Sequence, residues 1–264
     1  MDSTLRNRIL SAIIGIVLIV TFLTLKGWFV IIPSTILALI GVYEFHRAFL
    51  NIGYRSMVKG GMVLTLVTIA GFVLEPEHRA LFSIIALLLI FIILAYHVFS
   101  DHSIIDVLIT IFSVVYVVLP FVIIMLLGTR SDRLLWVVFV VAFATDSFAY
   151  FAGKTFGKNK LIESVSPNKT IEGAVGGVVG CLAATAIFKV LIMPELPWVF
   201  VLILGVLGSI ASQIGDLTAS KIKRHCKIKD FGNIIPGHGG VLDRFDSILF
   251  TAPIVLMTAW LMAL

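Results

Sequence analysis

A succession of apolar runs, each long enough for one membrane-spanning helix, leaves little of this chain for anything else. The hydrocarbon core of a bilayer is about 30 Å thick, and a helix of about 20 apolar residues spans it. Apolar residues make up 59% of the chain and charged residues only 13%, so a sizeable soluble domain is excluded. The runs lie at about 9–25, 28–45, 60–74, 80–99, 104–127, 134–152, 172–193, 198–219 and 246–264.

These runs predict an all-α fold, a polytopic integral membrane helical bundle of about nine transmembrane helices. Lys and Arg residues gather in the segments that are cytosolic if the N-terminus is cytosolic. Because cytoplasmic loops carry an excess of Lys and Arg, this orientation is the expected one. The net charge of +5 therefore reflects membrane topology rather than nucleic-acid binding. We expect a multi-pass protein of the cell (plasma) membrane.

Four aspartates occur where apolar runs meet the expected cytosolic side. Asp146 lies inside the run at 134–152, Asp216 lies near the end of the run at 198–219, and Asp243 and Asp246 lie at the start of the last predicted helix. Ionisable residues in a span are expensive and indicate function by default. The alternative is that each aspartate is a helix cap or an ion-pair partner, which is plausible for Asp246 alone but less so for all four together.

Clustered carboxylates repel one another, so a cation has to offset their charge. Oxygen ligands favour Mg²⁺ or Ca²⁺ over zinc, and Mg²⁺ commonly binds one or two carboxylates together with substrate phosphates. We therefore predict one or two divalent ions, most simply Mg²⁺, and leave an additional monovalent cation open. The metal-ligand candidates are Asp146, Asp216, Asp243 and Asp246.

Two long polar loops are expected on the same side, at 153–171 and 220–245. The second combines several Lys and Arg residues with the turn Pro-Gly-His-Gly-Gly at 236–240. Glycine backbone can approach an anion closely, and Lys and Arg bind phosphate. This loop is typical of a polyphosphate site at a membrane surface. An anionic-lipid anchor would explain the basic residues but not the glycine turn.

The segment from Ser220 to Asp246 resembles the signature of the CDP-diacylglycerol synthase (phosphatidate cytidylyltransferase) family. That signature reads S-x-hydrophobic-K-R, four residues, K-D, a small residue, and then H-G-G-x-x-D-R-x-D. The segments Ser166–Gly173 (SPNKTIEG) and Asp146–Gly157 resemble two further family elements. Ala219 departs from the pattern, because family members often have an acidic residue before the serine. The resemblance covers roughly 146–247 and divides the chain into N-terminal transmembrane helices (1–132) and a catalytic transmembrane region (133–264).

The resemblance implies a cytidylyltransferase that makes CDP-diacylglycerol and pyrophosphate from CTP and phosphatidic acid, with Mg²⁺, in phospholipid biosynthesis. The expected partners are CTP, phosphatidic acid and the lipid bilayer, and small-residue helix faces would permit a homodimer. The residues expected to be catalytic are Asp243, Asp246, Asp216, Lys223, Arg224 and His238. Those expected to bind substrate are Ser166, Asn168, Lys169, Glu172, Ser220, Lys221, Lys229, Gly239, Gly240 and Arg244.

Other functions compete with this one. Intramembrane aspartates and glycine-rich segments also mark transporters and ion channels, although no inverted repeat is evident. A lipid kinase that uses CTP and a membrane lipid is chemically close, and only substrate testing separates it. A CDP-alcohol phosphotransferase is disfavoured because its D-G-x-x-A-R pattern is missing from the sequence.

The orientation can be checked by labelling. Single cysteines introduced as Asp216→Cys or Asp243→Cys are expected to react only with reagents supplied from the cytosolic side of sealed vesicles. Labelling of either position from the outer side alone would contradict the predicted topology.

Overall fold

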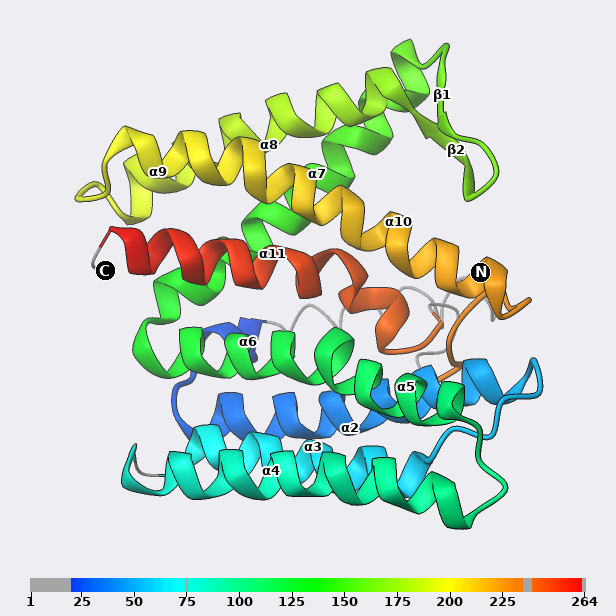
Figure 1. Ribbon diagram of the computed structural model, residues 1–264. Coiled ribbons are helices and arrows are strands. Elements are labelled where there is room, and N and C mark those ends of the chain that lie inside the picture. The colour runs from blue at the N-terminus through cyan, green and yellow to red at the C-terminus, as the bar shows by residue number, and fades with distance from the viewer. Residues whose placement is uncertain (1–19, 75, 235–238, 263–264) are drawn as a thin grey trace, which may run out of the picture. The chain divides into compact units, whose positions relative to one another are not determined.

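The computed structural model describes residues 20–74, 76–234 and 239–262, and helices make up most of them (Figure 1). Seven helices in this part of the chain are long and apolar enough to cross a membrane, and Val58–Val73 is a shorter apolar helix. The predicted all-α, multi-pass class is confirmed. The count of nine is not, because the first predicted run, 9–25, lies mostly outside the described residues, which are helical at 20–24.

The chain divides into two compact units. The first contains the chain up to Thr129 together with His225–Arg244, and the second contains Arg130–Arg224 and Phe245–Leu264. The predicted division at 132/133 into transmembrane and catalytic parts stays a prediction. The segment 225–244, which the sequence placed with the C-terminal region, groups with the N-terminal helices.

The first unit is built mainly from helices that pack side by side. In Figure 1, α2 lies along α3 and α3 lies along α4. Phe45 of α2 and Phe121 of α6 are fully buried in this unit. Its elements are α2 (Trp28–Leu50), α3 (Val58–Val73), α4 (Pro76–Tyr96), the 3-10 turn η1 (His97–Phe99), α5 (Ile104–Ser113), the π-helical turn η2 (Val114–Val118) and α6 (Leu119–Arg130).

A buried carboxylate fixes the start of α5. Asp106 forms a capping box with Ser103, whose backbone N–H donates to Asp106 Oδ2 at 2.7 Å. The backbone N–H of Arg55 also donates to Asp106 Oδ1, at 2.6 Å. Together these bonds satisfy a helix terminus and tie the α2–α3 turn to α5.

The second unit is built around two helices, α7 and α8, that pack along much of their length (Figure 1). A short antiparallel hairpin joins them, with Lys160 paired to Thr170. The elements are α7 (Asp132–Phe156), β1 (Lys160–Ile162), β2 (Ser166–Thr170), α8 (Ile171–Ile192), α9 (Trp198–Ile203), the π-helical turn η3 (Leu204–Gly208), α10 (Ser209–His225) and α11 (Leu242–Leu261).

One predicted boundary is wrong. Helix α10 continues to His225, so Ser220, Lys221, Lys223 and Arg224 are helical rather than part of a loop. Lys and Arg are good helix formers, so this helix extends beyond its apolar run. Helix α11 begins at Leu242, ahead of its apolar run, which confirms that Asp243 lies at the start of the last helix. Acidic residues are favoured there by the helix dipole.

Glycines let α7 and α8 approach closely. A Cβ at Gly176 would lie 2.2 Å from Ala152 Cβ, and one at Gly173 would lie 2.8 Å from the Ala149 carbonyl oxygen. Gly177 and Gly180 also face residues of α7. This stripe therefore serves close helix packing, as expected for small residues in membrane helices, rather than phosphate binding.

The substitution Gly176→Ala is expected to destabilise the protein by about 1–3 kcal/mol through overpacking. This loss should exceed the gain in helix propensity, which is at most about 1 kcal/mol. Unfolding titrations in detergent measure the change. Val175→Ala is the control, because Val175 lies on the exposed side of α8 and its truncation should have a smaller effect. Equal stability of the Gly176→Ala variant and the wild type would contradict the tight α7–α8 contact.

Candidate active site

Three of the predicted carboxylates form an electrostatic cluster in the second unit. Asp146 lies on α7, Asp216 on α10 and Asp246 on α11. Asp146 and Asp246 each interact electrostatically with Asp216, and Asp246 also interacts with Asp146. Three helices that are distant in sequence thus bring negative charge to one place.

Lys169 supplies positive charge to this cluster. Its Nζ lies 2.5 Å from Asp216 Oδ2, and both side chains are partly exposed, at 27% and 29%. Lys169 also interacts electrostatically with Asp146, and Lys223 with Asp246. The hairpin that carries Lys169 is therefore one source of the charge that offsets the carboxylates.

Hydroxyl groups complete the contacts of the cluster. Ser247 Oγ donates to Asp146 Oδ1 at 3.4 Å, and Ser220 Oγ donates to Asp216 Oδ1 at 3.3 Å. The Asp246 Oδ1 atom accepts from the backbone N–H of Ser247 at 2.8 Å. Ser220 was predicted from the sequence, whereas Ser247, which immediately follows an expected metal ligand, was not.

The donor chemistry of the cluster fits a divalent cation that is completed by substrate. Among the residues that the structure describes, no three His, Cys, Asp or Glu side chains are placed so that they could hold a metal by themselves. Magnesium usually keeps water and substrate phosphates among its ligands and needs only one or two carboxylates. Carboxylates that gather beside Lys169 match this kind of site. The predicted metal set itself stays a prediction.

Two predicted site residues, Glu172 of the substrate-binding set and Arg224 of the catalytic set, contact the backbone of the hairpin segment. Glu172 accepts from the backbone N–H of Lys158 at 3.0 Å and from Asn159 Nδ2 at 2.8 Å. Arg224 Nε donates to the Val165 carbonyl at 3.4 Å. Glu172 and Arg224 therefore have structural contacts, and their contact with substrate stays a prediction. Ser166 and Asn168 lie on β2, and Asn168 is exposed.

An open hollow of about 500 Å³ lies between the hairpin and α10. Its size is within the range of small-molecule sites, and its lining is mostly apolar. The cation at this hollow is Lys221, one of the predicted substrate-binding residues. The lining residues are Ile162, Ser164, Val165, Ile214, Leu217, Thr218, Lys221 and Ile222.

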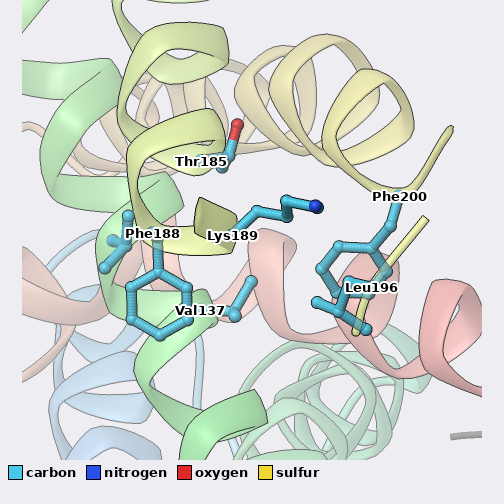
Figure 2. A pocket seen from close by; sticks show the side chains of 7 residues that line it. Val137, Thr185, Phe188, Lys189, Leu196 and Phe200 are labelled. Atoms are coloured by element: carbon cyan, nitrogen blue, oxygen red, sulfur yellow. The ribbon is translucent and has the colours of Figure 1, made fainter. Parts of the chain in front are cut away.

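A second hollow, near the α8–α9 connection, is much smaller. Figure 2 shows Lys189 among Val137, Phe188 and Phe200 at this place. Its volume is about 10 Å³, which is hardly enough for a single water molecule, so it cannot bind a nucleotide. The Lys189 ammonium lies 4.8 Å from the ring centroid of Trp198, which is a cation–π contact.

The remaining predicted residues belong to the first unit. Asp243 Oδ2 accepts from the backbone N–H of Phe231 at 2.8 Å and of Gly240 at 3.0 Å. Gly239 has a φ of 85°, which a residue with a side chain rarely adopts. Lys229 and Arg244 are exposed. The predicted catalytic His238 lies outside the described residues.

Glu44, a buried acidic residue of α2, was not predicted from the sequence. The residue is 2% exposed, and its carboxylate contacts the backbone at Val241 and Leu242. The signal was present, because Glu44 lies inside the apolar run 28–45 just as Asp146 lies inside 134–152. An ionisable residue in a span is a functional candidate by default.

Comparisons with known proteins agree with the resemblance described for the sequence. A curated protein from Staphylococcus saprophyticus (strain ATCC 15305) named phosphatidate cytidylyltransferase is 34% identical over 260 residues, which cover 95% of this chain and 97% of that protein. A protein of the same name from Staphylococcus aureus (strain COL) is 37% identical over 273 residues, with the same coverage. One from Bacillus subtilis (strain 168) is 50% identical over 114 residues, 43% of this chain and 42% of that protein. A sequence profile of the cytidylyltransferase family matches residues 6–262. The chain therefore belongs to the cytidylyltransferase family.

Proposed function

We propose that this chain is a phosphatidate cytidylyltransferase of the cell membrane, which makes CDP-diacylglycerol and pyrophosphate from CTP and phosphatidic acid on the cytosolic side. Relatives with that name cover 95% of the chain, which supports the choice of substrates. The observation that carries the mechanism is the cluster of Asp146, Asp216 and Asp246 beside Lys169.

The reaction is a displacement at phosphorus. A phosphate oxygen of phosphatidic acid attacks the α-phosphorus of CTP, a new P–O bond forms, and the bond between the α-phosphorus and the bridging oxygen breaks. The electron pair of that bond leaves with pyrophosphate. Phosphatidate is already an anion, so no side chain has to remove a proton from the nucleophile. Catalysis then consists mainly of positioning and of charge stabilisation.

The residues of the chain neutralise and orient two anionic reactants. Lys169 and Lys223 interact electrostatically with the carboxylate cluster, and they would bind phosphate oxygens as substrates enter. Because Lys169 is paired with Asp216, a phosphate would have to share or replace that contact. Lys221 lies at the apolar hollow beside α10, where an acyl or glycerol portion of the lipid would be out of water.

A divalent ion would be held by Asp216, Asp246 and Asp146, and the sequence prediction adds Asp243 to this set. When bound, it would neutralise the nucleotide phosphates and the charge that develops on the leaving pyrophosphate. Ser220 and Ser247 hold the Asp216 and Asp146 carboxylates by hydrogen bonds, which fixes the direction of their oxygens. The number of ions and the homodimer predicted from the sequence remain proposals.

Purified protein in mixed micelles should convert labelled CTP and phosphatidic acid into CDP-diacylglycerol, and Asp243→Asn should lower the rate by about 100-fold or more. The reason is that Asp243 is a predicted ligand of the ion that would neutralise the leaving pyrophosphate. Thin-layer separation of the lipid products measures it. A phosphorylated lipid and free CDP would indicate a lipid kinase instead. Ion flux in vesicles without nucleotide turnover would indicate a transporter or channel.

Removal of divalent ions with EDTA should abolish this turnover, and Mg²⁺ should restore it. Asp216→Asn removes one negative charge from the cluster, so it should raise the Mg²⁺ concentration required for half-maximal activity by about 10-fold or more. Lys158→Met serves as the control, because it also changes the charge near the hairpin but its side chain has no role in the predicted site. Turnover that persists in EDTA would remove the metal from the mechanism.

A further inference from the structure

Glu44 places a carboxylate against the backbone of a segment that is nearly 200 residues away in sequence. Its Oε1 accepts from the backbone N–H of Val241 at 3.0 Å, and its Oε2 accepts from that of Leu242 at 2.9 Å. All of these residues belong to the first unit. A buried charge is costly unless it is fully hydrogen-bonded, and these two charge-assisted bonds supply that compensation.

The position of Glu44 matters because Leu242 is the first residue of α11. The first N–H groups of a helix have no partner within the helix, and the helix dipole favours negative charge there. Glu44 thus caps α11 from another helix, α2. The first turn of α11 carries Asp243 and Arg244, and Asp246 follows one turn later on the same helix.

Two glycines show how closely the segment lies around Glu44. A Cβ at Gly232 would lie 2.2 Å from Glu44 Oε1, and a Cβ at Gly240 would lie 2.3 Å from the same atom. Any side chain at either position would displace the carboxylate. The second glycine of the His-Gly-Gly motif therefore has a packing reason that involves Glu44.

Asp243 also accepts hydrogen bonds from backbone N–H groups, as Glu44 does. Its Oδ2 holds the backbone N–H groups of Phe231 and Gly240, next to the two that Glu44 holds. Two carboxylates from two helices therefore determine the course of the backbone at 231–232 and 240–242. Gly239, Gly240 and Arg244 in this segment are predicted from the sequence to bind substrate, and Asp243 is predicted to bind the metal.

We propose that Glu44 is a positioning residue for cytidylyl transfer: it holds the backbone at Val241 and Leu242, and with it the start of α11, so that the Gly239–Arg244 residues keep their working geometry. The proposal rests on the proposed function. Glu44 does not touch the reacting atoms, because its carboxylate is buried and occupied by the two backbone N–H groups.

Asp106 offers a matched comparison within the same unit. It is also a buried carboxylate, 4% exposed, and it also accepts from backbone N–H groups at a helix start. The turn that it holds, next to Arg55, contains none of the predicted substrate-binding residues. Substitution of Asp106 therefore shows how the loss of a structural helix cap alone changes kcat. A larger loss of kcat on substitution of Glu44 would report positioning of the site residues.

Two variants perturb the Glu44 contact in different ways. Glu44→Gln keeps the size of the side chain, but its amide NH₂ would face one of the two N–H groups and lose that bond. Gly232→Ala leaves every charge unchanged and pushes a methyl group against Oε1. Both variants should lower kcat by about 10–100-fold, as is typical when a group that orients active-site residues is removed.

Hydrogen exchange measured by mass spectrometry provides a readout that does not depend on activity. Both variants should increase exchange in peptides that cover 239–243 by about 10-fold or more, with exchange in α8 unchanged. Asp106→Asn should increase exchange near 55 and 103–107, with kcat within about two-fold of the wild type.

The outcomes separate the two hypotheses. Unchanged exchange at 239–243 in both variants would overturn the role of Glu44. Faster exchange with unchanged kcat would reduce Glu44 to a structural cap and overturn the positioning role. A wild type without cytidylyl transfer would overturn the proposed function and the catalytic part of this proposal, whereas the exchange result would still report whether Glu44 holds the segment.

Discussion

The cost of placing carboxylates in helices that span an apolar medium governs how this protein is put together. Water is not available there to solvate a charge, so each carboxylate needs its own partners. Within the second unit, Asp216 has Lys169 and Ser220, and Asp146 has Ser247. Within the first unit, the backbone N–H groups at two helix starts serve Asp106 and Glu44. Each unit meets the same constraint with a different kind of partner.

These partners differ in whether their contacts can be exchanged when a substrate or an ion binds. Bonds to backbone N–H groups, such as those of Glu44, fix the course of the chain and cannot be exchanged for a substrate. An ion pair between partly exposed side chains, such as Lys169 with Asp216, can reorganise when an anionic substrate or a cation arrives. The rigid contacts therefore lie in the segment that carries the glycine turn. The adaptable contacts lie where the carboxylates of α7, α10 and α11 gather.

Close packing of α7 against α8 supports the contacts at the carboxylate cluster. Because Gly173, Gly176, Gly177 and Gly180 have no side chains, α8 can lie directly against α7. This packing fixes the relation between the helix that carries Asp146 and the hairpin that carries Lys169. Glu172 adds to it by holding the backbone at Lys158 and Asn159, where the hairpin begins. Membrane helices gain little from the hydrophobic effect between one another, so small residues and polar contacts have to provide the specificity.

Much of the candidate site could be predicted from the sequence, because a charged residue within an apolar run can be recognised from the sequence alone. Apolar runs alone gave the helical membrane class, and the intramembrane rule singled out Asp146. The ends of the helices could not be predicted in the same way. Lys221, Lys223 and Arg224 look like a loop because they are polar, yet they continue α10, since hydropathy reports the solvent and not the backbone conformation.

Residue types alone indicate that this chain spans a bilayer and which of its residues carry charge into it, because the burial of apolar side chains and the solvation of charged ones depend on residue type. Which groups compensate those charges depends on the folded structure. The partner of Glu44 is the backbone at Val241 and Leu242, and backbone N–H groups are the same in every residue, so no pattern of side chains could have revealed that contact.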